Sequence, residues 1–155
     1  MSFQRGSQTG IEGHYRRGAG PVDLAGRAGL MVRDDVQDSF LFGVQARVPF
    51  LFEEQSPLRG ALVAGAGLDV SGGATLWVPV GVSLGRRLVV EKSAVRLVPY
   101  AQPTVFFTSA GSGVEAGVGL GLDLRLSPAF EVRVSGGFGT AGAPDGVGVS
   151  AVWLR

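Results

Sequence analysis

The single histidine of the chain, His14, is its first candidate for catalysis. A serine hydrolase needs a serine hydroxyl within hydrogen-bond reach of a histidine base, and Ser2 and Ser7 are near His14 in the sequence. These serines lie in a segment without a regular pattern, so we interpret His14 as a residue without a catalytic role. One histidine in a chain that has no cysteine also predicts no metal site.

Three carboxylates, Glu115, Asp123 and Glu131, have the chemistry of glycosidase acids or of a proton path. Arginines such as Arg125 and Arg133 are interspersed with them, and buried carboxylates in proteins are normally paired with cations. We therefore interpret these carboxylates as partners in structural ion pairs. The nearby run G-V-G-L-G-L has glycines like those of a phosphate-binding loop, but no helix is predicted after it to hold a phosphate. The sequence thus predicts no enzyme and no cofactor.

The segment that carries two of these carboxylates, from Gly113 to Leu126, alternates strictly between two kinds of residue. Its even positions are all aliphatic, and its odd positions are Gly, Glu, Asp or Arg. A period of two predicts a β-strand, because successive side chains leave opposite faces. At about 3.3 Å per residue the strand is more than about 40 Å long, a length that suits a tilted strand across a bilayer.

The same alternation recurs along the chain and predicts eight strands. They are expected at Val22–Arg33, Ser39–Phe50, Arg59–Val70, Thr75–Gly85, Ala94–Phe107, Gly113–Leu126, Phe130–Gly139 and Gly146–Leu154. Mostly short links join them, which favours an antiparallel meander in a single domain over residues 21–155. Pro99 and Pro103 weaken the strand that contains them. Residues 1–20 are predicted to be either an N-terminal tail or an extra short strand around Ile11 to Arg16.

The composition favours a membrane location for these strands. The mean hydropathy is positive at +0.28, and only 17% of the residues are charged, against about 25% in soluble domains. No run approaches the roughly 18 apolar residues of a spanning helix, so the hydrophobicity is distributed as alternation. Glycine, at 26 of 155 residues, argues against long helices. The formal net charge of +1 gives no electrostatic basis for binding nucleic acid.

Alternation alone fits both a soluble barrel with an apolar interior and a membrane barrel with an apolar exterior. The polar face decides, because it is rich in glycine and nearly free of lysine, unlike a strand face in contact with water. Glycine beside charged residues suits the narrow lumen of a small barrel. The charges expected to line this lumen are Asp23, Arg27, Arg47, Asp69, Arg96, Glu115, Asp123, Arg125, Glu131 and Arg133. The aromatic residues expected at the two membrane interfaces are Phe40, Phe50, Phe107, Phe130, Phe138 and Trp153.

We therefore predict an all-β fold, a closed antiparallel up-and-down transmembrane β-barrel. It has eight strands, or ten if the N-terminal segment adds strands. The segment after Met1 lacks the apolar core of a signal peptide, so we expect that an upstream leader is missing from this sequence.

Two motifs and the strand pattern give the chain a family resemblance over about residues 21–155. The turn L-S-P-A-F at Leu126 to Phe130 is similar to short periplasmic turns, and the final strand G-V-G-V-S-A-V-W ends in Trp153, two residues before the end of the sequence. In these features the chain resembles the small bacterial outer-membrane β-barrels of the OmpA-membrane-domain and OmpX type. The resemblance implies a location in the bacterial outer membrane, contact with the lipid bilayer and the outer-membrane insertion machinery, and both termini in the periplasm.

The leading hypothesis is a non-enzymatic outer-membrane barrel with a structural role in the envelope. It has a polar, charge-paired lumen with at most a narrow path through it. We expect a monomer with no cofactor, no metal and no nucleic-acid partner. The first alternative is a soluble lipocalin-like β-barrel that binds an apolar small ligand in its interior. The second is an outer-membrane lipid hydrolase that uses His14.

Overall fold

The computed structural model describes residues 8–33, 38–52, 56–71, 73–89, 95–109, 113–140 and 146–155, and every helix or strand assigned in these ranges is a β-strand. No helix in them has the length and hydropathy of a membrane span. The strands, in chain order, are β1 (Gln8–Ala19), β2 (Val22–Arg33), β3 (Ser39–Leu51), β4 (Arg59–Val70), β5 (Ala74–Gly85), β6 (Leu88–Val89), β7 (Arg96–Thr108), β8 (Val114–Ser127), β9 (Phe130–Gly139) and β10 (Gly146–Leu154).

The strand bounds predicted from the alternation agree closely with those of the structure. β2, β4, β9 and β10 have the predicted bounds, and β3, β5 and β8 differ from the prediction by one residue at one end or both. β7 begins two residues after the predicted Ala94, which lies outside the described ranges. The segment around Ile11 to Arg16 belongs to a full strand, β1, while residues 1–7 of the predicted tail lie outside the described ranges.

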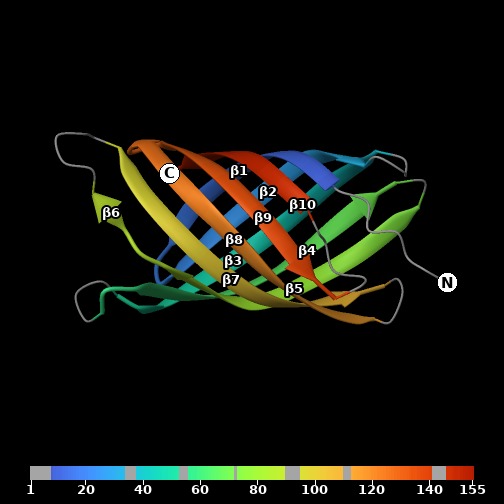
Figure 1. The fold of residues 1–155 in the computed structure, drawn as a ribbon, viewed down its shortest axis with the longest axis horizontal. Coiled ribbons are helices and arrows are strands. Elements are labelled where there is room, and N and C mark those ends of the chain that lie inside the picture. Colours follow the sequence, from blue (N-terminus) through green and yellow to red (C-terminus); the bar gives the residue numbers. More distant parts are fainter. Residues whose placement is uncertain are drawn as a thin grey trace.

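Nine of these strands form a closed barrel (Figure 1). Strands β1 to β5 pair antiparallel in chain order, β5 pairs with β7, and the antiparallel order continues to β10. The parallel pair of β1 and β10 closes the ring. β6 pairs with the first residues of β7 and lies outside the wall. The prediction of an all-β closed barrel is therefore confirmed, with ten strands in the sheet and nine in the barrel wall.

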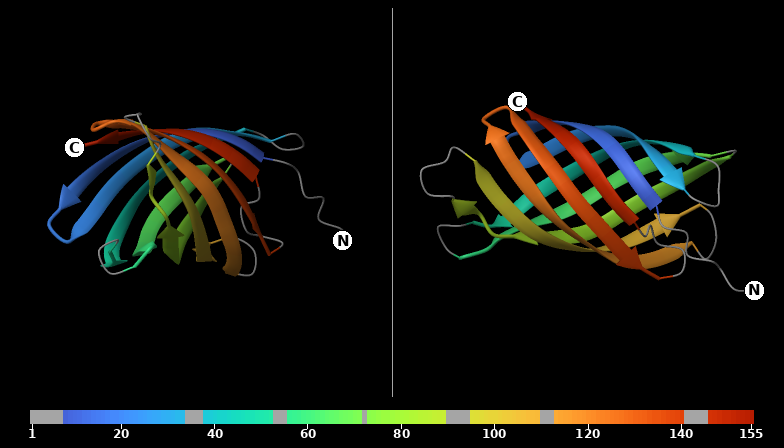
Figure 2. Two further views of the ribbon diagram at one scale, coloured as in Figure 1. Left: turned by 60° about the vertical axis from the view of Figure 1, so that its left-hand side comes forward. Right: turned by 45° about the horizontal axis from the view of Figure 1, so that its top comes forward.

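The odd number of wall strands explains the parallel closure. Strands alternate in direction around an up-and-down barrel, so the first and the ninth run the same way. The described chain therefore enters β1 at one end of the barrel and leaves β10 at the other, an arrangement that Figure 2 also shows. The resemblance implied a wall whose first and last strands begin and end on one side; the described wall differs, because the ninth strand closes the ring without a tenth.

Pro99 and Pro103 both lie within β7, which continues through them. Their rings are exposed on the outer face of the barrel. On the side toward β5, the pairing is interrupted between Thr104 and Ala101, where Pro103 has no N–H to donate. The loss of donors is therefore confined to the ladder between β5 and β7.

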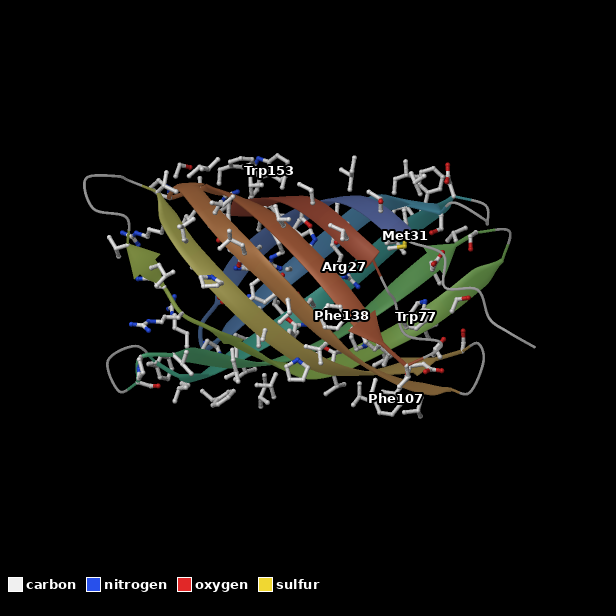
Figure 3. The ribbon with its side chains drawn as sticks, viewed as in Figure 1. Arg27, Met31, Trp77, Phe107, Phe138 and Trp153 are labelled. Atoms are coloured by element: carbon white, nitrogen blue, oxygen red, sulfur yellow. The ribbon has the colours of Figure 1, made fainter. Side chains whose placement is uncertain are left out.

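The barrel is apolar outside and polar inside. In the described ranges the only buried hydrophobic residues are Ala61, Val63 and Val152, whereas large hydrophobic side chains of every wall strand are exposed. Apart from Gly10, Gly60 and Gly67, the other buried residues in these ranges are polar or charged: His14, Ser39, Asp69, Ser83, Thr104, Asp123, Glu131 and Ser150. Figure 3 shows both faces, with Trp153 and Phe107 projecting from the outer surface and Arg27 within the barrel. This arrangement reverses the pattern of soluble proteins.

The parallel closure can be tested with a disulfide, because the chain has no native cysteine. Ile11 of β1 is the register partner of Val149 of β10, and both side chains are exposed on the outer face. Neighbouring strands are about 4.8 Å apart, which is within the Cα separation that a disulfide spans. We expect the variant I11C/V149C to form an intramolecular disulfide under mild oxidation, detected as a reductant-sensitive shift in non-reducing electrophoresis.

The matched control is I11C/W153C. Trp153 lies on the same face of β10 but four positions further along, about 13 Å away. A disulfide in the control and none in I11C/V149C would contradict the register of β1 and β10 described here.

Candidate functional site

The lumen holds an ion pair between Arg133 of β9 and Asp123 of β8. The two residues are directly opposite one another in the antiparallel register. Arg133 donates from Nε to Asp123 Oδ1 at 2.6 Å and from Nη2 to Asp123 Oδ2 at 2.8 Å. Their side chains are only 12% and 9% exposed. A bidentate, charge-assisted pair of this kind fixes the orientation of both groups.

Two further groups surround the same guanidinium. Glu131 Oε1 lies 3.8 Å from Arg133 Nη2, and the ring centre of Tyr100 lies 5.0 Å from Arg133 Cζ. The face of an aromatic ring attracts a cation at this distance. Two carboxylates and one aromatic ring therefore converge on Arg133.

A second group of lumen residues comes from β1. Glu12 Oε2 lies 2.7 Å from His14 Nε2, and the charge of Arg27 on the adjacent β2 acts favourably on the Glu12 carboxylate. The prediction of lumen residues missed Glu12, His14 and Arg16, because the sequence pattern of residues 1–20 fits both a tail and a short strand. The signal that identifies them is their alternation with outward-facing apolar or glycine residues.

Arg16 and Arg47 bring the two groups into one network. Arg47 Nη2 donates to Ser83 Oγ at 3.3 Å. The charge of Arg133 acts unfavourably on the guanidinium groups of Arg16 and Arg47, and the charges of Asp23 and Asp123 act favourably on both. Six of the predicted lumen residues thus belong to this network, which balances four arginines with four acids: Arg16, Arg27, Arg47, Arg133, Glu12, Asp23, Asp123 and Glu131. Equal numbers of opposite charges compensate for the cost of removing each from water.

Inward-facing glycines make room for the long side chains of the network. A Cβ at Gly29 would lie 2.6 Å from Glu12 Cγ, and a Cβ at Gly121 would lie 2.5 Å from the ring of Tyr100. Neither position has room for a larger residue without a shift of its neighbour. Glycine on this face is thus a packing requirement of a narrow lumen.

The other four predicted lumen residues lie apart from the network. Arg96, at the start of β7, is exposed, and Arg125 donates to carbonyl oxygens of the turn that follows β8. Glu115 accepts a hydrogen bond from Thr140 near the opposite end of β8. Asp69 is buried near the end of β4. Alternation predicts which face a residue occupies, but it does not predict how deep in the barrel the residue lies.

The predicted interface aromatics form two groups near opposite ends of the barrel. One group is Phe40, Phe107 and Phe138, and the other is Phe50, Phe130 and Trp153. All are exposed except Phe130, which is partly covered by an edge-on contact with Trp153 at 5.6 Å between ring centres. Phe40 and Phe50 are ten residues apart on β3. At a tilt of roughly 40° that span covers about 25 Å of the barrel axis, the height of the apolar band in membrane barrels.

His14, the candidate for catalysis, lies beside a carboxylate. The nearest described side-chain partner of His14 is Glu12, while Ser2 and Ser7 lie outside the described ranges. Within those ranges no group of three His, Asp or Glu residues could hold a metal ion. Comparisons of the chain with models of protein families, with curated proteins and with solved structures found no match.

Removal of one partner of the central ion pair is expected to destabilise the barrel. In D123L, Arg133 keeps its buried charge without its main partner, and we expect the free energy of unfolding to fall by about 3 kcal/mol. The double variant D123L/R133M removes both charges and is expected to lose less. Urea unfolding in detergent micelles measures both changes.

The matched control is E115Q, which alters a carboxylate of the same strand near its end, outside the network. Its expected effect is below about 1 kcal/mol. Equal destabilisation by D123L and E115Q would contradict a central role for the ion pair.

The space above Gly29 gives a second test of lumen packing. In G29A the new Cβ meets Glu12 Cγ at 2.6 Å and the Ile11 carbonyl oxygen at 2.7 Å, and a backbone atom cannot rotate away. We expect a loss of about 1 to 3 kcal/mol in the free energy of unfolding, as for other overpacked sites. The control G10A, on β1, meets its nearest atoms at 3.8 Å and is expected to change stability by less than about 1 kcal/mol.

Proposed function

We propose that this chain is a non-enzymatic β-barrel of the bacterial outer membrane, with a structural role in the envelope. The observation that carries the proposal is the orientation of the side chains, with large hydrophobic residues on the outer face and a charge network around the axis. In the described wall strands, the only charged residue on the outer face is Arg17, near the end of β1.

A hydrocarbon environment makes this outward orientation of the apolar side chains favourable. Val44 is 63% exposed and Phe138 57% exposed, and similar residues continue around the whole wall. Removal of apolar surface from water contributes about 25 cal/mol per Å². Soluble monomers rarely expose contiguous apolar patches larger than a few hundred Å². A bilayer around the barrel would cover all of this surface.

The closed ladder of strands supports the same proposal. Hydrocarbon offers no hydrogen-bond partners, so a sheet in a bilayer has to close on itself. The β1–β10 pair provides that closure and leaves no wall strand with an open edge. A closed edge also favours a monomer, because no strand can pair with a second copy.

The two alternative functions need side chains other than those observed in the lumen and beside His14. A lipocalin-like barrel holds an apolar ligand against hydrophobic interior side chains. The interior described here is lined by arginines, acids and hydroxyl groups. A lipid hydrolase needs a serine beside His14, whose nearest partner in the described ranges is Glu12. These observations favour the envelope barrel over both alternatives.

The proposed function is the one implied by the resemblance to barrels of the OmpA-membrane-domain and OmpX type. The two groups of aromatics and the short turns between strands support it, while the nine-stranded wall sets this barrel apart from an eight-stranded one. We propose that the outer-membrane insertion machinery contacts the end of β10, where Trp153 is exposed beside Phe130.

The lumen network limits what passes through the barrel. Asp123 and Glu131 are only 7% and 6% exposed, so side chains pack closely around the ion pair inside the barrel. The proposed function therefore includes at most a narrow path for small ions and no transport of larger solutes.

A single charged substitution on the outer face tests the membrane location. Val44 lies near the middle of β3, between the two groups of aromatics. In a bilayer, V44R places a guanidinium near the midplane and is expected to lower the free energy of unfolding by about 2 to 4 kcal/mol. In water the same change at an exposed valine is expected to cost less than about 0.5 kcal/mol. Urea unfolding in phospholipid vesicles measures the difference.

The matched control is V32R, at an exposed position near the end of β2. Close to the interface, its expected cost is about 0 to 1 kcal/mol. A barrel that remains monomeric without detergent, and that tolerates V44R as well as V32R, would rule out the membrane location.

A further inference from the structure

A groove of about 710 Å³ lies on the outer face of the barrel and crosses β10, β1, β2, β3, β4 and β5. Its small lining residues are Gly13 of β1, Gly26 and Ala28 of β2 and Ala66 of β4, and the larger Phe42 and Val44 of β3 lie between β2 and β4. Larger side chains border it, with Tyr15 and Trp153 at one end and Leu68 and Leu76 at the other. The groove is almost entirely apolar, and its volume is within the range of about 300 to 1,000 Å³ that ligand pockets have.

The groove runs obliquely across the apolar band. Trp153 lies next to the end of β10, whereas Leu76 lies near the start of β5, at the other end of the barrel. The floor is open, since a Cβ at Gly26 would meet no atom within 4 Å. An oblique, apolar groove of this course suits a flexible acyl chain.

Two arginines lie at the end of the groove marked by Trp153. Arg17 is two positions beyond Tyr15 on the outer face of β1, and Arg155 is two positions beyond Trp153. Backbone hydrogen bonds of Arg155 to β1, at 3.0 and 3.4 Å, continue the parallel pairing and place these arginines side by side. Both are exposed, and neither forms an ion pair with another described residue.

We propose that this face binds one anionic phospholipid, with its phosphate at Arg17 and Arg155 and one acyl chain in the groove. The inference rests on the proposed membrane location. Tyr15 and Trp153 lie between the charged and apolar parts of the site, where amphipathic rings are favourable. The charge of the arginines selects an anionic headgroup over a zwitterionic one. A second copy of the chain in a two-fold contact would bring four arginines together, so it is disfavoured as the occupant.

The test is native mass spectrometry of the full chain after extraction with a non-ionic detergent from vesicles that contain phosphatidylglycerol and phosphatidylcholine. We expect one phosphatidylglycerol to remain on the wild-type barrel. In R17Q/R155Q, its retention is expected to fall by roughly tenfold or more, because each cation near a headgroup contributes to binding. In G26F, which fills the floor of the groove, retention of both lipids is expected to fall.

Two variants outside the site are the controls. R86Q removes an exposed arginine next to β5, at the same end of the barrel, and G136F adds an aromatic ring to the outer face of β9, outside the groove. Both are expected to retain phosphatidylglycerol as the wild type does. Circular dichroism and heat-modifiable migration confirm that each variant is folded.

Three results would overturn the lipid site. The first is equal retention of phosphatidylglycerol by the wild type and R17Q/R155Q, and the second is equal retention by the wild type and G26F. The third is a wild-type dimer that the G26F substitution dissociates, because this result would assign the groove to a second copy of the chain. Insertion of the wild type into vesicles is measured first, by protection from protease. A protein that inserts but retains no lipid refutes the lipid site alone, whereas one that fails to insert refutes the proposed function itself.

Discussion

The hydrogen-bond ladder between β1 and β10 is the contact on which the rest of the structure depends. Eight successive residues of β1, Thr9 to Arg16, pair with Val147 to Leu154 of β10. Without this ladder the two strands would be open edges, and the sheet would have no enclosed interior. Once it forms, the number of strands and their stagger fix the radius of the wall. The closure therefore determines how much space the inward-facing side chains have.

A lumen of fixed and narrow width explains the composition of its lining. Two long side chains reach into the lumen where a neighbouring strand offers glycine, since Gly29 makes room for Glu12 and Gly121 makes room for Tyr100. Tyr100 in turn supports Arg133, which binds Asp123. Glycine, the aromatic ring and the ion pair are thus successive parts of one packing arrangement. The buried charge of Arg133 is compensated by Asp123 at 2.6 Å and by Glu131 at 3.8 Å.

The sequence predicts the wall and its two faces well, because a period of two is a local property of each strand. It predicts register poorly, because register is a relation between strands. Asp123 and Arg125 are close in the sequence and share a face, yet Asp123 binds Arg133 across the strands, whereas Arg125 binds the carbonyls of a turn. The inward-facing residues of β1 were missed because Gly13 interrupts the large apolar residues of its outer face. Whether β1 closes the ring also depends on its distant partner, β10.

The parallel direction of β1 and β10 gives the two ends of the barrel different roles. In an even-stranded barrel the chain returns to the side from which it started. With nine strands it does not, so polypeptide joined ahead of β1 and polypeptide joined behind β10 would be separated by the bilayer of the proposed location. Because the wall has an odd number of strands, a single polypeptide chain would then extend from one aqueous compartment into the other.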